Sequence, residues 1–328
     1  MEIYREKGER MRRLLALWFL CVMVAMGTEI YTPARQIKID GFAKDMVLRG
    51  NHLVIGTDKS SLLVYDYVAD RFVKKITIPD IKDFMGDVIP ARVASVDYLD
   101  GRYLLLSDSG KGGYADLRIH ENNVTKQILS AADKKPVIKA RFIDKDHVLL
   151  GYLSNEVSLM DLRSKKESYK FQLSESKFSD FALNEDRSLA AFSCESGEIT
   201  VLRTKDGKVL KRLNTINLDN VYKVDIKKSY VVGAGQDRRA SWYNWKTGKG
   251  GYFQASFLIY ATGLSPSAER AAYAMDEQNN ITVYNLLTQS KIALLKGQKS
   301  TLNSIIFKDD HTLFSASDDD TVMMWSIK

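Results

Sequence analysis

The chain has 328 residues, of which 45% are hydrophobic and only 5 are proline, and its formal net charge is +7. This composition excludes a disordered chain and suits one large domain with a buried core. The lysines are scattered along the chain rather than gathered in one segment, so we expect no nucleic-acid partner.

The first 27 residues have the layout of an export signal. Five basic side chains precede an apolar run of thirteen residues from Leu14 to Met26, and Ala25-Met26-Gly27 forms a small-x-small cleavage site. Because such a run is short for a membrane span, we predict a Sec-type signal peptide over residues 1–27 and a periplasmic protein without a membrane span after cleavage. The alternative is an N-terminal membrane anchor. Cleavage would leave Cys194 as the only cysteine, so no internal disulfide is expected.

The rest of the chain repeats, most clearly in the phrase SASDDDTVMMWS from Ser315 to Ser326. With Trp325 as the anchor of its unit, the equivalent anchors toward the N-terminus are Tyr284, Tyr243, Leu202, Met160, Leu117 and Tyr65. The spacings in that order are 41, 41, 41, 42, 43 and 52 residues. A period in the low forties with about four strands per unit is typical of a β-propeller. We therefore predict an all-β, seven-bladed β-propeller as a single domain over residues 28–328.

A strand near the N-terminus is expected to close the ring. Residues 35–39 precede the first full unit, whereas the last unit stops three residues after Trp325 and lacks a fourth strand. An unpaired sheet edge invites aggregation, and propellers commonly complete the last blade with a strand from the opposite terminus. We therefore predict that both ends of the chain meet in the last blade.

The 52-residue step predicts an enlarged loop between the first two blades, at residues 79–90. This loop places Phe84 and Met85 between the acidic residues Asp83 and Asp87. Insertions into repeats map to loops, often on the binding face, and aromatic and methionine side chains are frequent interface anchors. Two interpretations stay open, in which these side chains either contact a partner or fold back to cap the second blade.

Two further turns are expected on the same face. The hairpin loop of the second blade, residues 107–114, contains glycines that allow close approach by another backbone. Across the ring, Arg238 and Arg239 suit bidentate contact with a carboxylate or phosphate, or alternatively a salt bridge within the blade to Asp237. The candidate protein-binding residues of this face are Asp83, Phe84, Met85, Asp87, Asp108, Lys111, Tyr114, Asp237, Arg238 and Arg239.

The histidines do not suggest a catalytic centre. His52, His147 and His311 lie 13, 13 and 14 residues before their anchors, so they occupy one repeat position in three blades. Residues in repeat register are distributed around a ring and seldom converge on one atom. His120 is expected in a different turn, without an obvious partner.

Other chemical motifs are absent from the sequence. The glycine-rich run 110–113 lacks the pattern of a phosphate loop, and the acidic run 318–320 lacks the glycine and the glutamate of a calcium loop. We therefore predict a protein that is not an enzyme, with no catalytic residue, no metal site and no cofactor. The alternative is an enzymatic propeller of the lactonase or quinone-dependent dehydrogenase type, whose acidic and histidine residues would converge on the central channel.

The repeats resemble degenerate WD repeats, although the chain contains no Gly-His and no Trp-Asp dipeptide. A closer resemblance is carried by the phrases IKDFMGD, SDSGKGGY, LSESKFSDFAL, GAGQDRRA and AMDEQNN. They are similar to periplasmic nitrate reductase accessory proteins of the NapL type. That resemblance implies an exported propeller without a redox centre, which assists production or activity of the molybdenum-containing reductase.

These observations together predict a non-catalytic periplasmic scaffold that binds protein. The resemblance implies that its partner is the periplasmic nitrate reductase or one of its maturation components. A scaffold for outer-membrane assembly, which shares the architecture and the compartment, stays open as an alternative.

Overall fold

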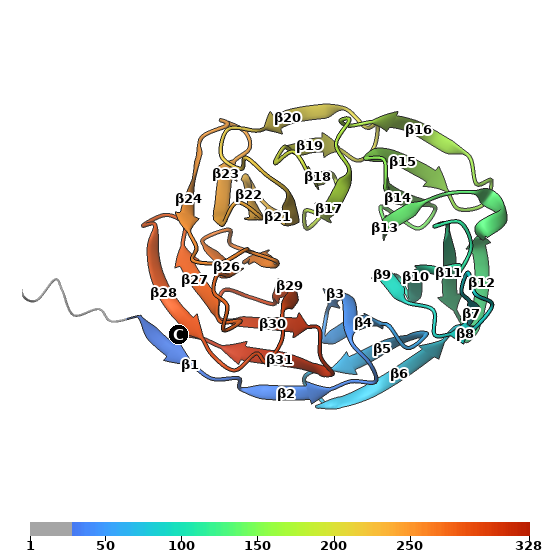
Figure 1. The fold of residues 1–328 in the computed structure, drawn as a ribbon, viewed down its shortest axis with the longest axis horizontal. Helices are drawn as coiled ribbons and strands as arrows, with labels where there is room; N and C mark the ends of the chain where they lie inside the picture. Colours follow the sequence, from blue (N-terminus) through green and yellow to red (C-terminus); the bar gives the residue numbers. More distant parts are fainter. Residues whose placement is uncertain (1–27) are drawn as a thin grey trace, which may run out of the picture.

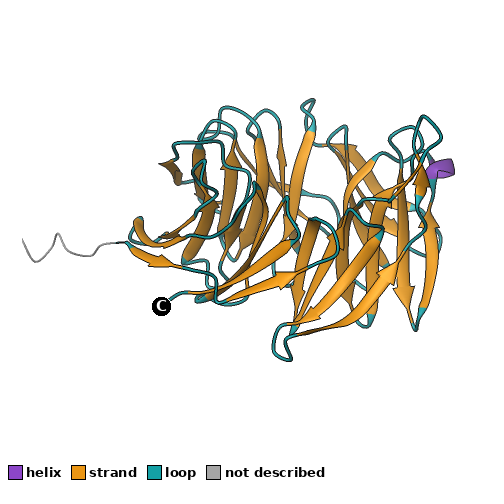
Figure 2. Ribbon diagram, turned by 60° about the horizontal axis from the view of Figure 1, so that its bottom comes forward, coloured by secondary structure: helices purple, strands orange, loops and turns teal. Residues whose placement is uncertain are grey.

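The computed structural model describes residues 28–328, and the expected signal peptide, residues 1–27, lies outside the described residues. The described chain forms seven large sheets arranged in a ring, as Figure 1 shows. Each sheet contains four antiparallel strands in order from the centre of the ring outward. Figure 2 shows strands running between two faces that carry the loops. The fold is therefore the predicted seven-bladed β-propeller.

The four strands of each blade are numbered here from the centre of the ring outward. The inner strands are β3 (Ala43–Arg49), β9 (Val93–Leu99), β13 (Val137–Phe142), β17 (Phe178–Leu183), β21 (Val221–Lys227), β25 (Thr262–Leu264) and β29 (Leu302–Phe307). The second strands are β4 (His52–Thr57), β10 (Arg102–Asp108), β14 (His147–Tyr152), β18 (Leu189–Cys194), β22 (Tyr230–Gly235), β26 (Arg270–Ala274) and β30 (Thr312–Ser317). The third strands are β5 (Ser61–Asp66), β11 (Ala115–Glu121), β15 (Glu156–Asp161), β19 (Ile199–Arg203), β23 (Arg239–Asn244), β27 (Ile281–Asn285) and β31 (Thr321–Ser326). The fourth strands are β6 (Arg71–Thr77), β12 (Val124–Leu129), β16 (Glu167–Gln172), β20 (Val209–Leu213), β24 (Gly250–Gln254), β28 (Ser290–Leu295) and β2 (Arg35–Lys38).

The N-terminal segment contributes two edge strands to the ring. β2 pairs antiparallel with β31 and completes blade 7, as predicted. A further strand, β1 (Glu29–Tyr31), pairs parallel with β28 and adds a fifth strand to blade 6. Figure 1 shows the two segments lying one after the other along the outside of the ring. The N-terminal segment therefore covers two sheet edges, of which the sequence predicts only one.

The pairing of strands corrects the repeat register in blade 2. In the other blades the anchor pairs with the second residue of the second strand, as Trp325 does with Leu313. In blade 2 the second residue of the second strand is Tyr103, and it pairs with His120. The prediction that Leu117 is the anchor of this blade is therefore wrong. The hairpin loop of blade 2 spans residues 109–114, whereas that of blade 1 spans 58–60. The extra length is therefore divided between this hairpin loop and the loop before the blade.

His120 consequently does not lie in a turn. It belongs to β11, is buried, and its Nδ1 shares a hydrogen bond of 2.8 Å with Oγ1 of Thr125. Burial lowers the pKa of His120, and the nearby ammonium group of Lys74 adds to this effect. The prediction that His120 has no partner is thus wrong.

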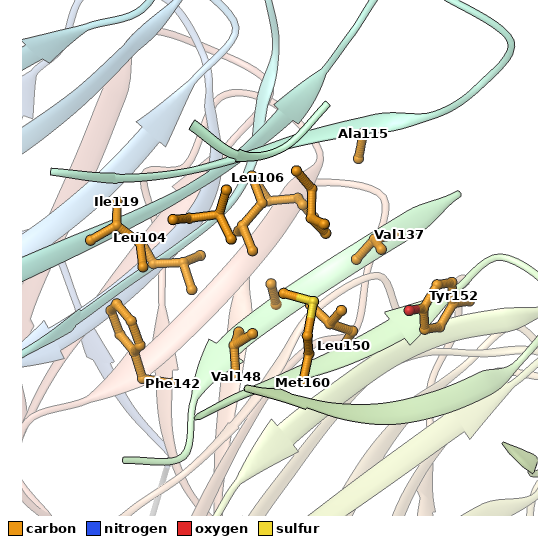
Figure 3. Packing of buried hydrophobic residues seen from close by; sticks show 14 residues of the cluster. Leu104, Leu106, Ala115, Ile119, Val137, Phe142, Val148, Leu150, Tyr152 and Met160 are labelled. Atoms are coloured by element: carbon orange, nitrogen blue, oxygen red, sulfur yellow. The ribbon is translucent and has the colours of Figure 1, made fainter. Parts of the chain in front are cut away.

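Apolar side chains between neighbouring blades form the core. Figure 3 shows the cluster between blades 2 and 3, in which Leu104 and Leu106 face Val148 and Leu150. Full burial of one such side chain stabilises the fold by about 1.5–3 kcal/mol. The anchor Trp325 is also fully buried, and its Nε1 donates a hydrogen bond of 2.8 Å to Oγ of Ser315.

Carboxylates on the inner strands join several blades to the next one. Each accepts a hydrogen bond from a backbone N–H of the following inner strand, which leaves neither group unsatisfied. The pairs are Asp45 with Val96 at 2.8 Å, Asp97 with Phe142 at 3.0 Å, Asp180 with Val224 at 3.3 Å and Asp225 with Leu264 at 2.9 Å. The centre of the ring is therefore held by charged groups as well as by apolar packing.

Candidate functional site

The loop between blades 1 and 2 forms a small hairpin of its own. Its strands are β7 (Ile81–Lys82) and β8 (Val88–Ile89). The carboxylate of Asp83 accepts hydrogen bonds from the backbone N–H groups of Met85 and Asp87, each at 2.9 Å. Gly86 completes the turn with a φ of +94°, a value that glycine adopts without strain. The local sequence therefore builds a defined turn rather than a loose loop.

This turn leaves its two large apolar side chains in solvent. Phe84 is 95% exposed and Met85 is 74% exposed. The interpretation in which they fold back and cap blade 2 is therefore wrong. Exposed apolar side chains held at the tip of an ordered turn form a ready contact surface.

The root of the hairpin is fastened to both neighbouring blades. On blade 1, Oγ of Ser60 donates a hydrogen bond of 2.6 Å to Asp80 and accepts one of 2.8 Å from the backbone N–H of Ala91. On blade 2, Gly110 lies so close to the hairpin that a β-carbon there would overlap the carbonyl oxygen of Lys82. The close backbone approach expected of this glycine-rich loop is thus present.

In the blade 2 loop, the predicted acidic residue has an internal partner. Asp108 accepts two hydrogen bonds from Arg92, from Nε and Nη2, both at 3.1 Å. Tyr114 packs its ring against Gly112, and its carbonyl oxygen accepts a hydrogen bond of 2.7 Å from Oγ of Ser109. These contacts order the loop beside the hairpin.

A groove of about 680 Å³ lies between the hairpin, the blade 2 loop and the inner strands of blades 1 to 5. We call it the hairpin groove. Five predicted residues line it, namely Asp83, Phe84, Asp108, Lys111 and Tyr114. Its apolar lining includes Ile81, Ile89, Ile138 and Leu153. The volume falls in the range of ligand-binding pockets in proteins.

The predicted residues on blade 5 do not line this groove. Arg239 donates a hydrogen bond to the carbonyl oxygen of Ile216, and its guanidinium lies 4.9 Å from the ring centre of Tyr252. Nε of Arg239 also lies 3.8 Å from Asp237, so the alternative of a salt bridge within the blade holds for this arginine. Arg238 is exposed in the turn with a φ of +62°. The two arginines therefore do not act as a pair.

Sequence reasoning missed three charged residues at the inner end of the hairpin groove. They are Lys139, Asp180 and Lys223, and each is the third residue of its inner strand. Nζ of Lys139 lies 2.5 Å from Oδ1 of Asp180, and Nζ of Lys223 lies 4.0 Å from the same oxygen. The inner strands of all blades surround the axis, so residues at the same position of these strands come close together. The sequence signal for this cluster is a charged residue about twenty positions before each of the anchors Met160, Leu202 and Tyr243.

Burial and neighbouring charges shift the pKa values of two groups at the inner end of the groove, Lys139 and Asp45. Burial lowers the pKa of Lys139, although the carboxylate of Asp180 opposes this effect. For Asp45, which also lines the groove, burial acts to raise the pKa, but the charges of Arg141 and Lys139 outweigh it and hold the pKa below its ordinary value. The charges at the inner end of the groove therefore influence one another.

The three histidines lie apart in their own blades, and only His52 and His147 share a repeat position, which Thr312 rather than His311 occupies in blade 7. His52 and His147 begin β4 and β14, and His311 directly precedes β30. His147 contacts Asp144 of its own turn at 2.9 Å. Within residues 28–328, no three His, Cys, Asp or Glu side chains are grouped so that they could hold a metal ion.

Comparisons with protein-family models and with curated proteins give no match to this chain. In the part of the chain that the structure describes, no helix has the length and apolar character needed to cross a membrane.

Proposed function

We propose that this propeller is a non-catalytic scaffold that binds another protein through the β7–β8 hairpin and the hairpin groove. The observation that carries the proposal is the exposure of Phe84 and Met85 at the tip of a turn that Asp83 orders. Because the turn is already ordered, its residues lose little conformational entropy on binding. Aromatic and methionine side chains in such positions provide much of the binding energy at protein interfaces.

We further propose that the partner belongs to the periplasmic nitrate reductase system. The resemblance to accessory proteins of the NapL type supports this identity, and the export signal expected at residues 1–27 supports the compartment. In this role the protein assists maturation or activity of the reductase and contributes no redox centre of its own.

A capture experiment tests the proposal with a matched control. The double variant Phe84→Ala/Met85→Ala removes the hairpin tip, whereas Val68→Ala/Leu287→Ala removes two apolar side chains of 66% and 62% exposure from turns that join third and fourth strands. We expect the first variant to capture at least about tenfold less reductase or maturation factor from periplasmic extract, because hot-spot side chains contribute about 2 kcal/mol or more each. The control variant should capture as much as wild type. Unchanged capture by the hairpin variant, or equal loss in both, would refute the proposal.

A further inference from the structure

The centre of the ring contains a second cavity, of about 550 Å³, that extends from the inner end of the hairpin groove toward the opposite face. We call it the channel cavity. Its lining residues come from the inner strands of blades 1 and 3 to 7 and from adjoining turns. Six basic residues line it, namely Arg49, Lys139, Arg141, Lys223, Lys227 and Lys308. Only three acidic residues do so, namely Asp45, Asp180 and Asp225.

Each of these carboxylates already has a cationic partner. Asp45 lies 2.7 Å from Arg141, Asp180 lies 2.5 Å from Lys139, and Asp225 lies 2.8 Å from Lys227. Each also accepts the backbone hydrogen bond that joins its blade to the next one. The acidic side chains of the cavity are therefore committed to holding the ring together.

Three basic side chains have no close acidic partner of their own inside the cavity. Lys223 reaches Asp180 only at 4.0 Å, at an oxygen that Lys139 already holds, and its Nζ makes no hydrogen bond to any described residue. Arg49 shares Asp97 with Arg187, which lies closer to that carboxylate at 2.6 Å than Arg49 does at 3.3 Å. The third is Lys308, whose partner Asp309 lies in the turn beyond the cavity.

A cavity with this imbalance attracts anions. Walls of low dielectric constant focus the field of like charges and raise the local concentration of counter-ions. Burial lowers the pKa of Lys139 and of Arg49; Asp180 and Asp97 oppose this effect, whereas neighbouring cations add to it. A bound anion would offset this repulsion and accept the hydrogen bonds that Lys223 can donate.

We propose that the channel cavity binds a small anion with two or more carboxylate or phosphate groups, and that Lys223 donates directly to it. The excess of three basic residues favours a multivalent anion over chloride. The volume suits a molecule larger than a single phosphate ion. This site does not depend on the proposed protein partner, and its occupant is a small molecule.

Titration calorimetry on the purified protein tests this site, with citrate and pyrophosphate as probes and acetate at equal ionic strength as the reference. Lys223→Gln removes the proposed donor, and Lys205→Gln removes the same charge from an exposed turn that joins β19 to β20. We expect saturable binding of at least one multivalent probe, at least about tenfold weaker binding by Lys223→Gln, and no change for Lys205→Gln. The variant Lys223→Arg should keep binding, and thermal unfolding should show that each variant is folded.

Three results would overturn the proposal. One is binding of neither probe beyond the acetate reference. Another is an equal loss of affinity in Lys223→Gln and Lys205→Gln, which would indicate a response to net charge alone. The third is unchanged affinity in folded Lys223→Gln.

Discussion

At the scale of single residues, glycines determine how closely the hairpin approaches blade 2. Gly110 and Gly113 both have a left-handed backbone, with φ of +73° and +71°. Only at Gly110 would a β-carbon meet another backbone, that of Lys82, whereas at Gly113 nothing lies within 4 Å. Position 110 therefore carries a steric constraint in addition to the conformational one.

Replacing Gly110 by alanine should destabilise the protein more than the same change at Gly113. Both variants incur the cost of a left-handed alanine, about 1–2 kcal/mol. Gly110→Ala must in addition displace the hairpin from the blade 2 loop. Urea unfolding should show the larger loss for Gly110→Ala, and limited proteolysis should show faster cleavage within residues 79–90. Equal losses in the two variants would mean that the hairpin does not pack where the structure places it.

The buried pair of Asp45 and Arg141 predicts a pH dependence of stability. Because Arg141 helps to hold the pKa of Asp45 below its ordinary value of 3.8, the ionised carboxylate stabilises the folded state above that value. This contribution is lost as the pH falls through the folded pKa. Asp45→Asn should therefore cost about 3–5 kcal/mol near neutral pH, since it leaves Arg141 without its charge partner. The difference from wild type, measured by urea unfolding, should shrink below about pH 4, and a difference that grows there would contradict the prediction.

At the scale of elements, the two N-terminal strands β1 and β2 have different structural roles. None of the three residues of β1 is buried, whereas β2 places Ile37 in the core between blades 7 and 1 at 3% exposure. β2 also covers the edge of β31, which would otherwise be open to pairing with another chain.

Truncation should separate these two roles. Deleting residues 29–32 removes β1 only, and we expect a small loss of thermal stability with the protein still monodisperse. Deleting residues 29–38 removes β2 as well, and we expect a much larger loss together with aggregation, because an open sheet edge and the core position of Ile37 are exposed at once. Differential scanning fluorimetry and size-exclusion chromatography measure both effects. Similar behaviour of the two truncations would contradict the assigned role of β2.

At the scale of the whole molecule, the period of the sequence predicts the number of blades because each unit must bury its faces against its neighbours. The closure by residues 35–38 follows from counting strands in the last unit. β1 is not predicted in this way, because three residues are too few to show an alternation of polar and apolar side chains. The blade 2 anchor is misplaced because the extra residues are divided between two loops, which spacing alone does not reveal.

The candidate site was predictable only in part, for a geometric reason. The insertion indicated the hairpin tip, and Phe84 and Met85 do lie exposed there. The sequence does not predict the cluster of charged residues around the axis, because residues in repeat register usually spread around the ring. On inner strands the same register instead brings Lys139, Asp180 and Lys223 together.

Site-specific photo-crosslinking in living cells tests the central proposal most directly. A photoreactive phenylalanine analogue at position 84 replaces a side chain that is 95% exposed, and the same analogue at position 287 serves as the control at 62% exposure. In cells that respire nitrate, position 84 should crosslink to the periplasmic nitrate reductase or one of its maturation components, and position 287 should not. Absence of any protein crosslink at position 84, or the same products from both positions, would contradict the account.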